Sequence, residues 1–549
     1  MSKKATKALN NKYYMLPFLL GLLGMFYQYR KGKTGKQDFW VVMLLFIMTG
    51  IAIIVFLNQT PMEPRERDYA YAGSFYAYAI WIGLGVLSIW EFLNKKIKNI
   101  DPRVSAIAVT TVCLFAIPVN MAAQNWDDHN RHARYATTAH ARNYLNSCAP
   151  NAILFTYGDN DTFPLWYVQE VEGVRRDVRV VNLSLLSGSW YIDQMKRKAY
   201  ESSGVPISFT HEQYRDGKRD YVLIRDQFKE GNLKDVMEFV ASDLPQTKLQ
   251  GYIKELDFIP TRNVILPVDS AKVIANGTVK PQDADQIVKD LRLHLPMQGL
   301  TKSQLMVLDI LSTNNWERPV YFGIGLGSDA YMGLEKYFQL EGAAYRVVPI
   351  ETKEAEFYDY GRIDSDILYD NIMNKFEWGN IKDPKVNIDF FHDQTIAVMK
   401  YRNTFLRLAQ KLYDEGKQAE AVAVLDKSLE EIPLYQVPAD NSMLFYIPMY
   451  YELGETEKAN HLLNELATNN YQMLKYANSL EPKFANTPSI QQEERLSIEV
   501  IKQLLAFATQ AGQKELAQEL QDKVLRLYNP SHISPDKPLM KDTADKAGK

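Results

Sequence analysis

The chain has 549 residues, enough for several domains at about 100–200 residues each. Hydrophobic residues make up 46% of it, and 63 Lys and Arg stand against 66 Asp and Glu, which excludes a strongly basic nucleic-acid binder and an acidic disordered protein. The charge is unevenly spread, because residues 1–123 carry 14 Lys and Arg but only 6 Asp and Glu. The two parts of the chain are therefore suited to different surroundings.

Residues 1–123 are predicted to form a transmembrane region in a lipid bilayer. Three runs without charge, residues 39–57, 70–90 and 104–123, are close to the roughly 20 residues that a helix needs to cross the hydrocarbon. Residues 13–27 are apolar over a shorter length, which suits a short span, a re-entrant segment or the apolar part of a signal peptide. We favour a span, because the residues that follow are too bulky for a signal-peptide cleavage site.

The basic residues predict an orientation for these spans. Residues 29–38 and 91–103 each contain four Lys or Arg, which places both loops in the cytoplasm and residues 124–549 outside it. Four lysines before the first run oppose this rule. Either that run does not cross the membrane, or Met1 is not the natural start of the protein.

Residues 124–380 are predicted to form an extracytoplasmic α/β domain. Strands at 151–157 and 177–186 flank a helix at 163–171, a spacing typical of a parallel βαβ unit. We expect a second such unit in the same mixed sheet, with strands at 319–324 and 345–350 and a helix through 331–340. Between the two units, the sequence indicates little beyond a helix that begins near residue 231.

Residues 381–530 have the periodicity of helices. Large and small apolar residues and a glycine follow tetratricopeptide spacing in a first copy, with weaker second and third copies: Phe405, Leu408, Ala409, Leu412, Gly416, Ala421, Leu425 and Pro433. The alternative is a set of ordinary helical hairpins. Residues 531–549 are polar and are predicted to be a disordered tail. The predicted fold class is therefore multi-domain, with α-helical transmembrane segments, a βαβ-type mixed sheet and α-helical tetratricopeptide-like repeats.

Two carboxylates follow the first predicted strand of the α/β domain. Asp159 and Asp161 are positioned to hold a divalent cation, Mg²⁺ or Mn²⁺, against the phosphates of a sugar donor. The competing interpretation is that one of them caps the helix expected to begin near Thr162. No other cofactor is suggested by the residues.

Polar residues at the predicted outer surface of the membrane form a second candidate site. Arg65 and Arg67 are candidates to bind a lipid-linked phosphate through paired hydrogen bonds, and the alternative is that they pair with neighbouring acids or with lipid headgroups. The wall of a polar pocket is predicted from Glu66, Asp68, Asp127, Asp128 and His129.

Residues 325–330, with the sequence GLGSDA, imitate the glycine-rich fingerprint of a dinucleotide-binding fold. We interpret them as a structural turn from strand to helix, because a domain outside the cytoplasm meets little NAD and the following helix is short.

Several long blocks together resemble a known family. They are NQ at 58–59, PRERDYAYAGSFY at 64–76, WDDH at 126–129, GDNDTFPLWY at 158–167 and KYFQLEG at 336–342. The chain is similar in these blocks to Bacteroidetes membrane proteins of the domain-of-unknown-function 2723 family. That family is related to the vertebrate protein O-mannosyltransferase of plexin-type domains and belongs to the polytopic GT-C glycosyltransferases.

The resemblance implies a function and a place in the cell. The chain would be the C-terminal half of an enzyme in the bacterial inner membrane, with residues 124–549 in the periplasm. That enzyme would transfer a sugar from a polyprenyl-phosphate donor to exported acceptor proteins, without nucleic acid as a partner. The family's catalytic acid would lie upstream of this sequence, so no catalytic residue is assigned. The alternative function is a membrane-anchored tetratricopeptide scaffold in envelope assembly.

Overall fold

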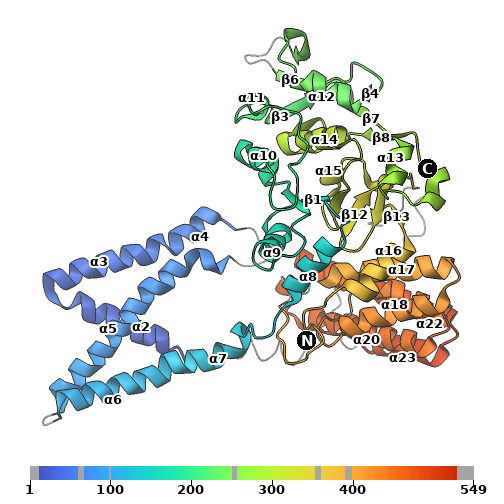
Figure 1. Cartoon of the computed structure of the whole chain (residues 1–549). Helices are drawn as coiled ribbons and strands as arrows, with labels where there is room; N and C mark the ends of the chain where they lie inside the picture. Colours follow the sequence, from blue (N-terminus) through green and yellow to red (C-terminus); the bar gives the residue numbers. More distant parts are fainter. Residues whose placement is uncertain are drawn as a thin grey trace, which may run out of the picture. The chain divides into compact units, whose positions relative to one another are not determined.

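The computed structural model describes residues 11–59, 67–97, 100–249, 256–352, 360–389 and 398–527. The chain divides into two compact units, Met1–His132 and Ala133–Lys549, and each is described by itself (Figure 1). The predicted tail at 531–549 lies outside the described residues.

The first unit is made of apolar helices. Three helical stretches have the length and the apolar composition of membrane-crossing helices, Gly32–Leu57, Asp68–Lys96 and Pro102–Asp127, which correspond to the three long predicted runs. The helix at the short predicted run spans 14 residues. The elements are α2 (Leu16–Tyr29), α3 (Gly32–Met48), α4 (Ile51–Leu57), the 3-10 turn η1 (Asp68–Tyr71), α5 (Ala72–Lys96), α6 (Pro102–Leu114), the π turn η2 (Phe115–Val119) and α7 (Asn120–His129).

Helices α2 and α5 pack closely because glycines stand at their contact. A Cβ atom on Gly24 would lie 1.7 Å from the carbonyl oxygen of Trp81, so no larger residue fits there. Near the start of both helices the Tyr78 hydroxyl donates to the carbonyl of Phe18, and beyond the end of α2 Lys31 lies 2.5 Å from Glu91. The two helices therefore run parallel. Lys31, just after α2, and Lys95, in the last turn of α5, both lie beside Glu91, so these basic residues gather at the same end of this unit. The orientation of the spans in the membrane stays a prediction.

The second unit contains a six-stranded mixed sheet in the order β13-β11-β12-β10-β1-β2. Strand β1, next to the edge strand β2, is parallel to both β2 and β10, and α9 (Asp159–Glu170) connects β1 to β2, which confirms the first βαβ prediction. Every residue of β1, β2, β10 and β12 is buried. The strands are β1 (Ile153–Thr156), β2 (Arg179–Asn182), β10 (Val320–Gly323), β11 (Phe338–Leu340), β12 (Ala344–Val347) and β13 (Arg362–Ile363).

The second predicted βαβ unit is wrong, although its strands do belong to the same sheet. The expected helix is reduced to α15 (Ser328–Tyr331), and β11 and β12 form an antiparallel hairpin beside β10. The helix stops because Met332 and Gly333 have φ angles of 51° and 83°, in the left-handed region. This arrangement also excludes a dinucleotide-binding βαβ unit at residues 325–330.

The region for which the sequence indicated little forms two smaller sheets. Helix α12 (Leu233–Ala241) begins where expected, and its cap Asn232 accepts a hydrogen bond from the backbone of Lys234. Helix α14 (Lys302–Asn314) begins with a capping box of Thr301 and Gln304. One sheet has the order β5-β6-β3-β9 and the other β4-β7-β8, with strands β3 (Tyr221–Ile224), β4 (Gly231–Asn232), β5 (Lys248–Leu249), β6 (Leu256–Ile259), β7 (Asn263–Pro267), β8 (Asp290–His294) and β9 (Gly299–Thr301).

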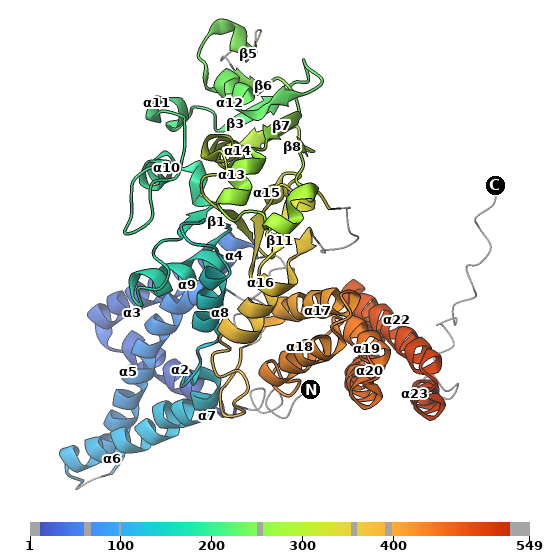
Figure 2. The same ribbon diagram turned by 45° about the vertical axis from the view of Figure 1, so that its right-hand side comes forward.

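The C-terminal region is helical, as predicted, and its helices lie side by side in Figure 2. Three pairs of consecutive helices are each joined by a turn whose glycine, Gly416, Gly454 or Gly512, has a φ angle of 74–79°. The assignment of these pairs as tetratricopeptide repeats stays a prediction. The helices are α17 (Met399–Asp414), α18 (Gln418–Glu431), α19 (Met443–Glu452), α20 (Thr456–Ser479), α21 (Pro482–Ala485), α22 (Pro488–Gln510) and α23 (Lys514–Leu527). One hydrophobic core runs from Ala136 to Leu520 and joins the sheet to these helices.

Candidate functional site

The candidate site lies at the carboxyl edge of the six-stranded sheet. Strands β1, β2 and β10 are parallel, so all three end at this edge. The chain leaves β1 toward β2 on one side, whereas β10 occupies the other side. In open α/β sheets, ligands bind where neighbouring connections diverge in this way. The residues that follow β1 and β10 are therefore the candidates for binding or chemistry.

The two predicted carboxylates lie in the first turn of α9 and do not cap it. The cap is Gly158, whose φ of 73° and ψ of −178° start the helix at Asp159, three residues earlier than expected. No side chain among the described residues caps this end of the helix, and Asp159 and Asp161 lie inside it, so the capping hypothesis is wrong. Their charges still favour the helix, because its N-terminus carries a partial positive charge.

Asp161 turns inward, whereas Asp159 is exposed. The Asp161 Oδ2 atom accepts hydrogen bonds from the Tyr144 hydroxyl and from the backbone N–H of Tyr157, both at 3.2 Å. Its Oδ1 atom is buried and has no hydrogen-bond partner among the described residues. Burial raises the pKa of Asp161, and the nearby positive charge of Lys400 opposes that shift.

A close backbone approach brings Tyr144 to this carboxylate. Tyr144 lies on α8 (Ala136–Asn146), which packs against α9. A Cβ atom on Gly323, at the end of β10, would lie 1.6 Å from the Tyr144 hydroxyl. Only glycine at this position leaves room for the hydroxyl.

His140, on the same helix as Tyr144, is a buried neutral imidazole. Its Nδ1 atom lies 2.9 Å from the hydroxyl of Tyr401 on α17, and its ring stacks on Tyr144 with centroids 5.4 Å apart. Its Nε2 atom is buried without a hydrogen-bond partner in the described part of the chain. Burial, helped by the charge of Lys400, lowers the pKa of His140 to about 3.

Lys400 contributes the positive charge of the cluster. Its Nζ atom lies 3.4 Å from the carbonyl oxygen of Ile324, just after β10. Gly325 follows with a φ of 87°, and a Cβ atom there would lie 3.1 Å from Nζ. The cluster thus combines a carboxylate with a free oxygen, a neutral imidazole with a free nitrogen and a cation. Such groups can accept or donate hydrogen bonds to a polar ligand or move a proton.

The metal hypothesis for Asp159 and Asp161 stays a prediction. Among the described residues there is no group of three His, Cys, Asp or Glu that could hold a metal ion. Two carboxylates would therefore need further oxygen ligands from a bound phosphate or from water.

The residues predicted at the outer membrane surface make local contacts or lie outside the described residues. Arg65 and Glu66 lie in residues 60–66, outside the described residues. The backbone of Asp128 belongs to α7, but its side chain is not described. Asp68 accepts a hydrogen bond from the backbone of Tyr69 at 2.9 Å. His129 Nδ1 lies 3.1 Å from the carbonyl oxygen of Asn125, one turn earlier in α7. The phosphate site of Arg65 and Arg67 and the polar pocket, which also includes Asp127, stay predictions.

The sequence interpretation missed four members of the cluster, His140, Tyr144, Lys400 and Tyr401. None of them belongs to a recognisable motif, and His140 and Tyr401 are 261 residues apart in the chain. The only signal for the site in the sequence was that Gly158–Asp161 and the glycines after residue 322 each follow the end of a predicted strand.

One comparison with known proteins finds a match, which covers a domain in the middle of the chain. The family model described as TMEM260-associated domain 2 matches residues 137–367. The matched region contains all the strands of the sheet as well as His140, Tyr144, Asp159 and Asp161, and it ends before Lys400. No curated protein and no solved structure matches the chain. Together with the three long apolar helices, this match indicates a membrane protein.

Proposed function

We propose that the chain is the C-terminal part of a polytopic membrane glycosyltransferase. It would help to transfer a sugar, mannose in our proposal, from a polyprenyl-phosphate donor to Ser or Thr hydroxyls of exported proteins. The observation that carries the proposal is that helices suited to a bilayer precede a domain similar to one associated with TMEM260. The sequence blocks that resemble the domain-of-unknown-function 2723 family, and through it the GT-C glycosyltransferases, support the choice of chemistry.

In this proposal, each of the two units binds a different substrate. The first unit would hold the donor in the bilayer, with Arg65 and Arg67 on its phosphate. The second unit would lie in the periplasm, on the outer side of the bacterial inner membrane, and would engage the acceptor protein. The catalytic acid would come from membrane helices other than those described here.

A transfer assay tests this proposal. The gene would be expressed with its native flanking sequence in a host that has no hexose-transfer activity of its own, and membranes would be prepared from that host. They would be supplied with polyprenyl-phosphate mannose and a Ser/Thr peptide. We expect hexose transfer, and we expect it to fall by about 10–100-fold for each phosphate contact removed in the Arg65→Gln, Arg67→Gln double variant.

The matched control is the Lys33→Gln, Lys36→Gln double variant, which removes the same charge from the predicted cytoplasmic loop and should retain transfer. If the full gene product reaches the membrane in normal amounts and transfers no hexose, the proposal is wrong. The scaffold function would then be the better interpretation.

A reporter fusion tests the orientation separately. Alkaline phosphatase joined after residue 132, the boundary between the two units, should be active because the enzyme needs the periplasm to form its disulfides. Activity at that position from a reporter that works only in the cytoplasm would contradict the proposed topology.

A further inference from the structure

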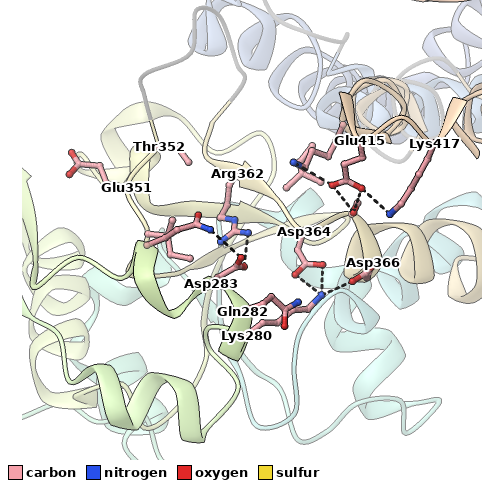
Figure 3. A pocket seen from close by; sticks show the side chains of 15 residues that line it. Lys280, Gln282, Asp283, Glu351, Thr352, Arg362, Asp364, Asp366, Glu415 and Lys417 are labelled. Carbon is pink, nitrogen blue, oxygen red and sulfur yellow. Dashed lines mark hydrogen bonds and ion pairs between the residues drawn. The ribbon is translucent and has the colours of Figure 1, made fainter. Parts of the chain in front are cut away.

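A polar cleft of about 640 Å³ lies in the second unit beside β13, the edge strand of the six-stranded sheet (Figure 3). Its walls come from the 3-10 helix η5 (Pro281–Gln286), the start of α16 (Ser365–Tyr369) and the turn between α17 and α18. Lys411, in the last turn of α17, lines the cleft, whereas Lys400 and Tyr401 of the Asp161 cluster lie in its first turn. The helix rise separates these turns by about 15–20 Å, so the cleft is a different site.

The charges on one side of the cleft are paired with each other. Lys280 lies 2.8 Å from Asp364 and 2.9 Å from Asp366. Arg362 Nη2 donates to Asp283 at 2.8 Å. The Nη1 atom of Arg362 is buried and has no hydrogen-bond partner among the residues that the structure describes.

The opposite side is built around Glu415. Lys417 lies 2.9 Å from its carboxylate and Lys411 lies 3.3 Å away, while the Ser365 hydroxyl donates to it at 2.9 Å. Burial favours the neutral form of Glu415, but these hydrogen bonds outweigh it and lower its pKa. Both sides of the cleft thus present charged groups whose geometry is fixed before any ligand arrives.

This arrangement favours neutral polar ligands over ionic ones. Four Lys or Arg and five Asp or Glu side chains line the cleft. Each is already held in an ion pair, Glu351 by Lys336, so an ionic ligand would have to compete with an existing pair. No group of described residues there could hold a metal ion. A hydroxyl can donate to the spare lone pairs of a paired carboxylate and accept from a spare N–H without breaking the ion pair. A molecule with many hydroxyls can therefore use both sides of the cleft.

We propose that this cleft binds a neutral oligosaccharide. Its volume lies within the about 300–1,000 Å³ of small-ligand pockets, and the unpartnered Nη1 of Arg362 supplies a donor for one sugar hydroxyl. The inference goes beyond the proposed function, because it assigns a binding site that takes no part in transfer. The sugar would belong either to a glycosylated protein or to a lipid-linked precursor.

Titration calorimetry on the full chain in detergent tests the cleft, with free mannotriose as the probe. We expect mannotriose to bind, and inorganic phosphate not to bind. Asp366→Ala should weaken mannotriose binding about tenfold or more, since it removes an acceptor and frees Lys280 from its second partner. The Asp366 side chain is 73% exposed, so this substitution should leave the melting temperature unchanged.

The control is Lys382→Gln, which breaks a similar surface pair with Glu430 and Glu431 outside the cleft and should not change binding. A mannosylated peptide and a polyprenyl-phosphate mannose then distinguish the two sources of the sugar. Absence of mannotriose binding, binding that Asp366→Ala does not change, or binding of phosphate instead would overturn the inference. A chain that transfers hexose but does not bind mannotriose would refute the cleft alone, and the reverse result would refute only the proposed function.

Discussion

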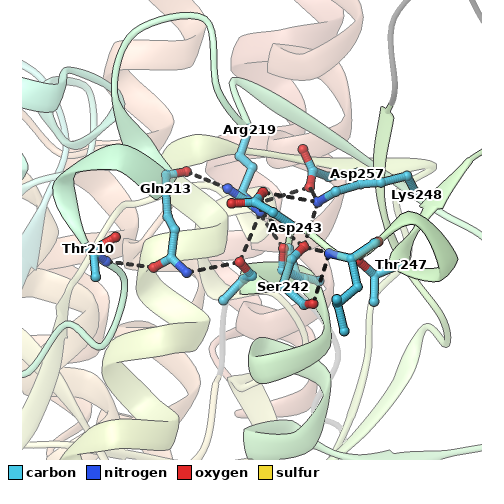
Figure 4. Close-up of polar contacts among 11 residues, drawn as sticks. Thr210, Gln213, Arg219, Ser242, Asp243, Thr247, Lys248 and Asp257 are labelled. Atoms are coloured by element: carbon cyan, nitrogen blue, oxygen red, sulfur yellow. Dashed lines mark hydrogen bonds and ion pairs between the residues drawn. The ribbon is translucent and has the colours of Figure 1, made fainter.

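Two buried polar clusters in the second unit differ in how completely their hydrogen bonds are satisfied. In the first, drawn in Figure 4, the Arg219 side chain is only 1% exposed and every one of its nitrogens has a partner. Arg219 donates to the last carbonyls of α12 and pairs with Asp243 at 2.9 Å and Asp257 at 3.3 Å. Lys248 completes the cluster at 2.5 Å from Asp257. This cluster joins a helix end to a small sheet.

The second cluster, at the carboxyl edge of the large sheet, keeps two buried atoms without partners in the described part of the chain. They are Oδ1 of Asp161 and Nε2 of His140. Each such atom costs about 1–3 kcal/mol of folding free energy. A satisfied cluster stabilises the fold, whereas an unsatisfied one retains the capacity to bind or react. The comparison therefore assigns a structural role to the first cluster and makes the second the candidate for a functional site.

The largest effect is expected from Arg219→Met. Removing the guanidinium takes away the donor to the carbonyls of Gln213 and Val240 and one of the two cations beside Asp257, which keeps Lys248. At about 1–3 kcal/mol for each buried carbonyl, this should cost about 2–6 kcal/mol. Hydrogen exchange of the full chain in detergent, measured at the amides of α12 and β6, would give this loss. Arg176→Met is the control, because Arg176 pairs with Glu201 and lies over the Tyr200 ring, both at the surface, and should cost about 1 kcal/mol. Equal losses of stability in the two variants would show that the buried Arg219 cluster stabilises the fold no more than an exposed ion pair does.

The next effect is a pH dependence due to His140. Its pKa falls from 6.5 in the unfolded chain to about 3 when folded, so its contribution to stability is present above pH 6.5 and is lost as the pH falls toward 3. The loss amounts to about 2 kcal/mol at pH 5. His140→Gln should remove this part of the pH dependence of hydrogen exchange in β1 and β10. An unchanged profile would show that the imidazole is not buried in the folded protein.

A smaller loss is expected from Tyr144→Phe. The variant keeps the ring against His140 but removes the hydroxyl that donates to Asp161, at a cost of about 1 kcal/mol. Thermal melting of the full chain would measure it. A gain in stability of Tyr144→Phe would mean that steric strain between the hydroxyl and Gly323 outweighs the hydrogen bond to Asp161.

The smallest effect on stability, and the largest on function, is expected from Asp161→Asn. The folded pKa of Asp161 is raised above its ordinary value of 3.8, so the wild-type carboxylate lowers stability as the pH rises above 3.8. The amide should abolish this decrease and leave stability at pH 7 equal or higher. If hexose transfer in the assay proposed above is also unchanged, the cluster has no part in the proposed reaction. Asp216→Asn, which changes an exposed carboxylate outside the candidate sites, is the control.

The sequence predicted local structure well where neighbouring residues decide it. The βαβ unit around β1 follows from apolar runs on either side of Gly158, and the helix after Asn232 follows from its cap. The helix expected at 331–340 did not form because Met332 adopts a left-handed conformation, which no local pattern indicated. The candidate site was located through Asp159 and Asp161, but its other members come from segments that only the fold brings together.

The distance in the chain between His140 and Tyr401 has a consequence for biosynthesis. They are 261 residues apart, and at about 5–20 residues per second the ribosome needs about 10–50 seconds between them. During that time the carboxyl edge of the sheet lacks α17, and the apolar faces that α17 covers are open to water. A nascent chain that stops before Met399 would contain nearly the whole of the α/β layer and none of the charge of Lys400. Quality control that binds exposed apolar surface therefore has a defined interval in which to recognise it.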